Sequence, residues 1–159
     1  MAIWQVELYF IPVSWVEKRE FDISPLDLRK NLDVNSAWGD AQPDPSFKYV
    51  FSKIFRPTKA WDKNLLIWGN KQGNDIQVWY KGERVSSIVA RLDFRYDFNV
   101  LVIKLVKAAR LLNCVLYFPE CDNMVESNEF KVSKAAETAE LLRELQINQA
   151  IKTDLDLTD

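Results

Sequence analysis

The chain has 159 residues, of which 48% are hydrophobic and 28% charged, and its formal net charge is −2. This composition is typical of one globular domain and excludes a disordered chain. The slight acidic excess disfavours DNA or RNA as a partner, because nucleic-acid-binding domains carry a surplus of basic residues.

The residues that the chain lacks limit its chemistry. It contains no histidine and two cysteines, Cys114 and Cys121. Ser-His-Asp and Cys-His catalysis are therefore excluded, and a structural zinc site would need more ligands. Glycine-rich phosphate loops are also missing from the sequence. We expect two free thiols, no metal and no cofactor, and we assign no catalytic residue.

The first residues, from Met1 to Glu7, lack the basic start and the apolar run of a signal peptide. No apolar stretch reaches the ~20 residues that a membrane span needs. We therefore expect a cytoplasmic protein that does not enter a membrane.

The first third of the chain predicts one strand and two helices. Residues 3–13 alternate, with Gln5 and Glu7 on the side opposite the apolar residues, as in a strand. Ser24 and Pro25 suit the start of a short helix to about residue 32. The polar segment 35–44 is predicted to be a loop. A second helix is expected to begin near residue 45 and to end before Pro57, because proline disfavours helical geometry in the preceding residue.

The strongest signal is a β-hairpin over residues 74–95, preceded by a strand at 65–68. Its predicted core face consists of Ile76, Val78, Tyr80, Ile88, Ala90, Leu92 and Phe94. Paired residues on neighbouring strands point to the same face of the sheet, and the core-face residues of both strands have even numbers. The two residue numbers of each pair must therefore add up to an even number. A turn at 81–83 satisfies this condition, whereas a two-residue turn at 81–82 does not. We therefore predict that Tyr80 pairs with Arg84, which places Asp75 diagonally beside Arg91.

The last third predicts two helices and a strand. A nearly continuous apolar segment from Asp97 or Asn99 to about residue 112 predicts a helix buried on most sides. Only a narrow basic stripe, which contains Lys104, Lys107 and Arg110, is expected to be exposed. A strand at 114–118 and a helix at 131–145 follow, with Leu142 and Leu145 on the buried side of that helix.

These elements predict one α+β domain over residues 1–146, followed by an acidic, frayed tail at 147–159. The sheet is expected to be mostly antiparallel, with four to five strands and with helices packed mainly on one face.

The candidate binding surface is the side of the hairpin opposite its core face. We call it the polar face, and its residues are Asp75, Gln77, Trp79, Arg91, Asp93 and Arg95. One interpretation is a solvated strand surface with cross-strand ion pairs. The other is a recognition surface, in which arginines bind carboxylate or phosphate and Trp79 is an anchor.

The other tryptophans are assigned by their surroundings. Trp38 lies in the acidic loop at 35–44, so it is either a binding hot spot or a lid that folds back on the core. Trp4, Trp61 and Trp68 are expected to be core residues.

The segment between Trp68 and Leu145 contains several short sequence patterns. They are Gly73-Asn74-Asp75-Ile76, Gly82, Arg91-Leu92-Asp93-Phe94-Arg95, Ala108-Ala109, Cys114 and Ala135–Ala139. In these positions the chain resembles a family of small bacterial proteins that are similar to toxin-immunity proteins of bacterial competition systems. It departs from the family pattern at Glu137, where a small polar residue is expected. The resemblance covers about half the chain and implies a small, non-enzymatic protein whose partner is a toxin.

The leading hypothesis is a non-enzymatic module that binds another protein. One alternative is a hydrolase that uses carboxylates and arginine, which requires two carboxylates that converge in a pocket. Another is a regulatory domain that binds a small ligand in an aromatic pocket between the helix at 45–55 and the sheet. A homodimer formed through an edge strand or an aromatic patch is compatible with all three.

Overall fold

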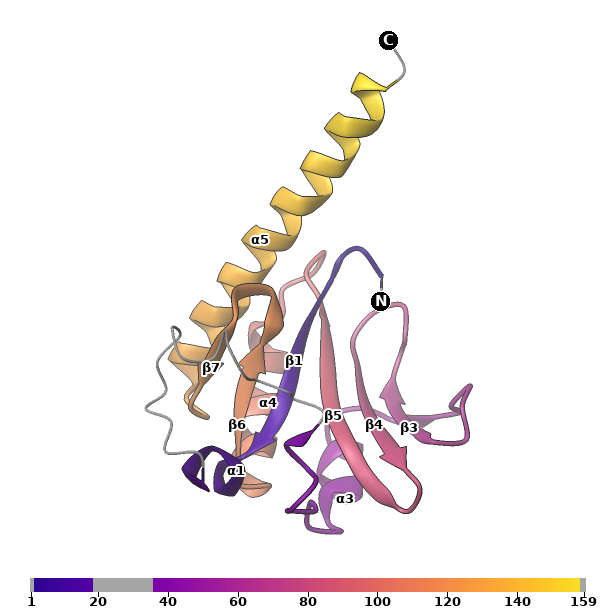
Figure 1. Ribbon diagram of the computed structural model, residues 1–159, viewed down its shortest axis with the longest axis vertical. Helices are drawn as coiled ribbons and strands as arrows, with labels where there is room; N and C mark the ends of the chain where they lie inside the picture. The colour runs from indigo at the N-terminus through magenta and orange to yellow at the C-terminus, as the bar shows by residue number, and fades with distance from the viewer. Residues whose placement is uncertain (1, 19–35, 158–159) are drawn as a thin grey trace.

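Seven antiparallel strands form one sheet within residues 2–18 and 36–157, which are the residues that the computed structural model describes. Their order across the sheet is β2-β3-β4-β5-β1-β6-β7 (Figure 1). The strands are β1 Gln5–Pro12, β2 Pro57–Thr58, β3 Leu65–Gly69, β4 Asp75–Lys81, β5 Arg84–Asp93, β6 Cys114–Phe118 and β7 Asn123–Val125. The predicted α+β class is confirmed, although the sheet has more strands than predicted. The short edge strands β2 and β7 were missed because two or three residues give no periodicity.

The helices are α1 Val13–Lys18, α3 Phe47–Ser52, α4 Asn99–Leu111 and α5 Glu129–Asp156, and a short 3₁₀ helix, η2, covers Pro119–Cys121. Aspartate side chains accept backbone hydrogen bonds just before two of these helices. Before α3, Asp44 Oδ1 accepts the N–H of Ser46 at 2.8 Å, and before α4, Asp97 Oδ1 accepts the N–H of Asn99 at 2.9 Å. The helix predicted to begin at Ser24 and Pro25 lies outside the described residues.

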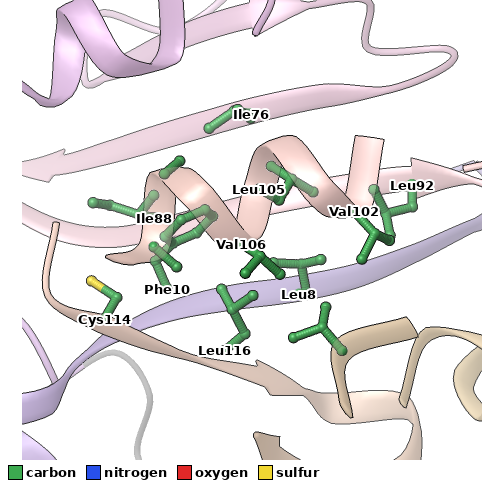
Figure 2. Packing of buried hydrophobic residues seen from close by; sticks show 14 of the residues in the cluster. Leu8, Phe10, Ile76, Ile88, Leu92, Val102, Leu105, Val106, Cys114 and Leu116 are labelled. Carbon is green, nitrogen blue, oxygen red and sulfur yellow. The ribbon is translucent and has the colours of Figure 1, made fainter. Parts of the chain in front are cut away.

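Helix α4 lies across the core face of the sheet. Figure 2 shows its Val102, Leu105 and Val106 directed toward strand residues that include Leu8 and Ile88, and all five are fully buried. The predicted core face of the hairpin is confirmed, with Tyr80 and Phe94 half-buried and the other members almost completely buried. Each fully buried aliphatic side chain contributes roughly 1.5–3 kcal/mol, so this layer is the main source of stability.

A smaller apolar cluster lies on the other face of the sheet, where α1 follows β1. Its buried members are Ile11, Trp15, Val16, Ala37, Val115, Tyr117 and Met124. Helices α3, α4 and α5 contribute only to the larger cluster. Packing is thus mainly on one face, as predicted.

The hairpin register differs from the prediction by two residues. Asp75 pairs directly with Arg91, Trp79 pairs with Ser87, and Lys81 pairs with Arg84. The turn therefore contains only Gly82 and Glu83. Gly82 has φ +63°, which glycine adopts without strain at the first position of a two-residue hairpin turn. A bulge follows, in which Ser86 is the extra residue of β5. This bulge restores the even sum, so the predicted faces are right although the predicted pairs are wrong.

Helix α5 is longer than predicted and continues to Asp156, through most of the segment expected to be frayed. Its first half buries Val132, Ala135, Ala136 and Ala139. The expectation that Leu142 and Leu145 are buried is wrong, because these side chains are 36% and 57% exposed. The sheet ends before the helix does, so the later turns have no surface to pack on (Figure 1).

Two leucines of α4 provide a matched test of this packing. Leu105 is fully buried, whereas Leu111 is 72% exposed. We expect Leu105→Ala to lower the free energy of unfolding by about 2–5 kcal/mol, because it removes buried methyl groups and leaves a cavity. Leu111→Ala should change it by less than about 0.5 kcal/mol. Urea denaturation followed by circular dichroism measures both, and equal losses would contradict the position of α4.

Candidate functional site

Most of the predicted polar face is buried, which corrects both interpretations of it as an open surface, although Trp79 is half-buried and Arg95 is exposed. Asp75, Gln77, Arg91 and Asp93 are between 0% and 8% exposed. Their cover is the turn between β3 and β4, whose backbone carbonyls accept hydrogen bonds from the sheet. Arg91 Nη2 and Gln5 Nε2 both donate to the carbonyl of Lys71, each at 3.2 Å. Sequence alternation identified the face correctly but could not show that a loop covers it.

The centre of this face is an ion pair between Asp75 and Arg91, on neighbouring strands. Arg91 Nε donates to Asp75 Oδ1 at 2.7 Å, and Arg91 Nη2 donates to Asp75 Oδ2. Gln77 Nε2 donates to the same carboxylate at 3.1 Å, and Trp79 Nε1 donates to Gln77 Oε1 at 3.1 Å. The polar side chains of the two strands thus form one connected chain, in which each buried group satisfies the next.

A second pair joins Asp93 and Arg95, two further residues of the predicted face. Arg95 donates to Asp93 through Nε at 2.9 Å and Nη2 at 2.6 Å, and these hydrogen bonds hold the pKa of Asp93 below its usual value. The Arg95 guanidinium lies 3.9 Å from the centre of the Trp4 ring. Trp4 is half-buried in this contact, not in the core as expected.

Glu7 is the site residue that sequence reasoning missed. It pairs with Arg91 from β1, so Arg91 lies between two carboxylates, Asp75 on β4 and Glu7 on β1. Burial raises the pKa of Glu7, and the nearby Arg91 partly opposes that rise. Tyr9 shares a hydrogen bond with Glu7, and burial with the nearby carboxylate raises the pKa of Tyr9 to about 12. Alternation placed Glu7 on the correct side of β1, but it could not identify β5 as the neighbouring strand.

A hollow of about 370 Å³ opens above Arg91, lined by Ala2, Trp61, Lys71, Gln72 and Arg91. The expectation that Trp61 is a core residue is wrong, because it is 54% exposed. It packs edge-on against Trp79 at 6.3 Å, and the Lys71 ammonium lies 5.4 Å from its ring centre. Asp75 and Glu7 offset the charge of Arg91, so the hollow has little net attraction for an anion.

Trp38 does not form an exposed binding anchor. It is 2% exposed, packs in the main core, and donates from Nε1 to the carbonyl of Phe10 at 3.0 Å. The interpretation of Trp38 as a lid on the core is the one that fits its position. Gln42 ties this loop to β5, since its Nε2 donates to the carbonyls of Trp38 and Val85. Trp68 is 3% exposed and belongs to the core as predicted.

The outer side of α3 and α4 is a second candidate surface. We define the α3–α4 face as Tyr49, Lys53, Val100, Ile103, Lys104, Lys107 and Leu111, all exposed. The prediction that only a narrow basic stripe of α4 is exposed is wrong, because Val100 and Leu111 are 67% and 72% exposed. A groove of about 260 Å³ runs between the helices, lined by Tyr49, Val50, Lys53, Ile54, Lys104, Lys107, Ala108 and Leu111.

Neither cysteine is part of these surfaces. Burial raises the pKa of the Cys114 thiol to about 12 and also raises that of Cys121, and both are free. Among the described residues, no group of three or more Cys, Asp or Glu side chains could hold a metal ion. No helix within residues 2–18 and 36–157 is long and apolar enough to cross a membrane.

Comparison of the chain with protein-family models, with curated proteins and with solved structures finds no match.

The buried ion pair can be tested by a double-mutant cycle. We expect Asp75→Asn to lower the free energy of unfolding by about 3 kcal/mol, because it leaves the Arg91 charge buried with only Glu7 nearby. Arg91→Leu should then cost less in the Asp75→Asn background than in the wild type, by about 1–3 kcal/mol. As a control, Glu126→Gln breaks the pair of Glu126 with Lys131, whose side chains are 62% and 54% exposed. It should cost much less than Asp75→Asn, because water screens an exposed pair, and an equal cost at both pairs would contradict the assignment.

Glu7 should make stability depend on pH. Its folded pKa lies above the ordinary 4.5, so above that pH the folded state keeps a proton that the unfolded state releases. The free energy of unfolding of the wild type, relative to Glu7→Gln, should therefore fall as the pH rises from 4.5 through the raised pKa.

Glu126→Gln is the control for pH as well. Hydrogen bonding to Lys131 lowers the pKa of Glu126, so stability relative to this variant should rise with pH in the acid range. Denaturant unfolding between pH 3 and pH 8 measures both differences. The same trend for both variants would contradict the assignment of Glu7.

Proposed function

We propose that this chain is a non-enzymatic protein-binding module that binds an acidic protein through the α3–α4 face. The observation that carries the proposal is the segregation of charge on two adjacent helices. Helices α3 and α4 contain no aspartate or glutamate, in a chain whose net charge is −2, and two of their cations, Lys104 and Lys107, lie on the α3–α4 face. Lys53, directly after α3, adds a further cation. A basic surface on an otherwise acidic protein favours encounters with acidic partners in one orientation.

Exposed apolar side chains within this basic surface favour a protein partner. Val100 and Leu111 are 67% and 72% exposed. Leu111 lines the groove together with the less exposed Val50 and Ile54 and with Lys53, Lys104 and Lys107. An apolar centre with a polar rim is the usual arrangement of a protein interface. Nucleic acid has less support, because a phosphate backbone offers no apolar side chains to fill the groove and is repelled by the net negative charge of the rest of the chain.

The small-ligand alternative has less support from this groove. Its volume, about 260 Å³, is below the ~300 Å³ at which pockets for drug-sized ligands begin. A groove of this size suits one side chain of a partner. The hydrolase alternative has less support as well, because Asp75 and Asp93 are each held in an ion pair with an arginine and are both buried. The hydrolase mechanism requires two carboxylates that point into the same pocket, and Asp75 and Asp93 do not meet this requirement.

The resemblance to toxin-immunity proteins gives the proposal its finer form. The partner is then a bacterial toxin with an acidic patch that contains at least one protruding apolar side chain. In this form the chain blocks the toxin by covering that patch, and the buried polar face serves only to hold the hairpin in register under the loop at 70–73.

A pair of charge reversals tests which surface binds. Pull-down is carried out from the organism that encodes the chain, with wild type, Lys104→Glu/Lys107→Glu, and Lys59→Glu/Lys71→Glu as the matched control. The control reverses Lys71, which lines the hollow above Arg91, and Lys59, which lines a neighbouring pocket that shares Trp61 and Lys71 with it. We expect a protein that wild type and control retain and that the α3–α4 variant loses. Its dissociation constant, measured with purified proteins, should rise at least about tenfold in that variant and should depend on salt.

The same experiment distinguishes the alternatives. Loss of binding only in the Lys59→Glu/Lys71→Glu variant would move the binding surface to the hollow and overturn the proposal. If the captured protein is toxic when expressed alone and harmless when co-expressed with the wild-type chain, the immunity form is supported. Full protection by the α3–α4 variant would contradict it.

A further inference from the structure

The later turns of α5 extend beyond the rest of the described fold (Figure 1). Arg143 still contacts the body, since its Nε donates to the carbonyl of Ile3 at 3.0 Å. Beyond it every residue of the helix is exposed except Ile147, which is intermediate. A helix surrounded by water is expected to be polar on all sides. Instead, α5 exposes Leu141, Leu145, Ile151 and Leu155 by 54–63%.

These four side chains share one side of the helix and are arranged symmetrically. Leu141 and Leu145 lie seven and three residues before Asn148, and Ile151 and Leu155 lie three and seven residues after it. At 3.6 residues per turn, all four point within about 60° of the direction of Asn148. The pattern therefore reads the same in both directions along the helix. Such self-complementarity is what a two-fold interface between identical chains requires.

We propose that two copies of this chain associate by antiparallel pairing of their α5 helices, centred on Asn148. In this arrangement Leu141 packs against Leu155 of the partner subunit, and Leu145 packs against Ile151 of the partner subunit. Each contact occurs twice, because the two-fold axis relates them. The Asn148 side chains meet at the axis, where a polar pair between apolar residues favours one register over shifted ones.

Two charged residues within the same arc favour the antiparallel direction. Glu144 and Lys152 lie four residues before and after Asn148, about 40° from its direction, so each faces its opposite charge on the other copy. Parallel pairing would instead bring Glu144 against Glu144 and Lys152 against Lys152. Glu140 and Asp156, eight residues from Asn148, are a like-charged pair, but they lie at the outer rim where water and salt screen them.

The sheet offers a poorer surface for the same purpose. Its edge strands β2 and β7 have two and three residues, which leaves little backbone for pairing with a second copy. The apolar stripe of α5 thus accounts for a homodimer better than the edge-strand route considered from the sequence.

The association is tested with the full chain by sedimentation equilibrium over a range of concentrations. We expect the mass to rise from 18.6 kDa toward twice that value. Leu145→Asp and Ile151→Asp should each raise the dissociation constant at least about tenfold. Ala150→Asp places the same charge on the opposite side of the helix and should leave the dissociation constant unchanged. Circular dichroism of each variant should show that the helix is retained.

Charge exchange and cross-linking test the geometry. Glu144→Lys should weaken the dimer, and addition of Lys152→Glu should restore it. Under mild oxidation Asn148→Cys should form a disulfide-linked dimer, whereas Leu141→Cys should not, because its two copies lie about 21 Å apart along the antiparallel pair. Wild type, with Cys114 and Cys121, gives the background.

Three results would overturn the proposal. One is a wild-type protein that stays monomeric at every concentration. This result would overturn the proposal even if the monomer binds anionic vesicles through Leu145 and Ile151. Another is equal weakening by Ala150→Asp and Leu145→Asp. The third is cross-linking of Leu141→Cys as efficient as that of Asn148→Cys, which indicates parallel helices.

Discussion

Strand β1 joins two parts of the sheet that come from distant parts of the chain. It pairs with β5 through Tyr9 and Val89, and with β6 through Phe10 and Leu116. Without it, the hairpin of β4 and β5 and the pair of β6 and β7 have no contact within the sheet. Its alternating side chains also contribute to both faces. Leu8 and Phe10 belong to the core layer that packs against α4 and α3. On the reverse side Glu7 pairs with the buried Arg91, and Gln5 pairs with Asp93 and donates to the carbonyl of Lys71, which also accepts from Arg91. The core and the polar face therefore both depend on the position of β1 between β5 and β6.

The predicted features that depend on residues close together in the chain agree best with the structure. The alternation of apolar and polar residues from Ile76 to Leu92 is a local property of the two hairpin strands, and it identified the core face correctly. The pairing was wrong because the extra residue Ser86 leaves no mark on the apolar pattern. The prediction that the polar face is exposed was wrong for a different reason. Its cover comes from Lys71 and Gln72 and from the N-terminal residues, and hydrogen bonds such as that from Trp4 Nε1 to the carbonyl of Gln72 join segments that no local pattern relates.

The errors in the helices have a common physical origin. Leu111 and Leu145 were expected to be buried because apolar residues at helical spacing favour burial. The spacing defines a side of the helix, but not whether anything within the same chain covers it. In α4 one side packs in the core and the other remains exposed beside lysines, and in α5 the contact with the body ends while the apolar pattern continues. The apolar spacing therefore identified one side of each helix correctly, but the prediction that the chain itself buries Leu111 and Leu145 was wrong.

The two ends of the sheet give this arrangement a safeguard against aggregation. An exposed strand edge can pair with any other edge, so it can lead to open-ended assemblies. Here each edge is only two or three residues long, and Pro57 removes a backbone donor from one of them. The chain can consequently display exposed leucine and valine side chains on helices, whose own backbone hydrogen bonds are satisfied internally. A helix surface of this kind offers no unpaired backbone for the edge-to-edge pairing that leads to fibrils.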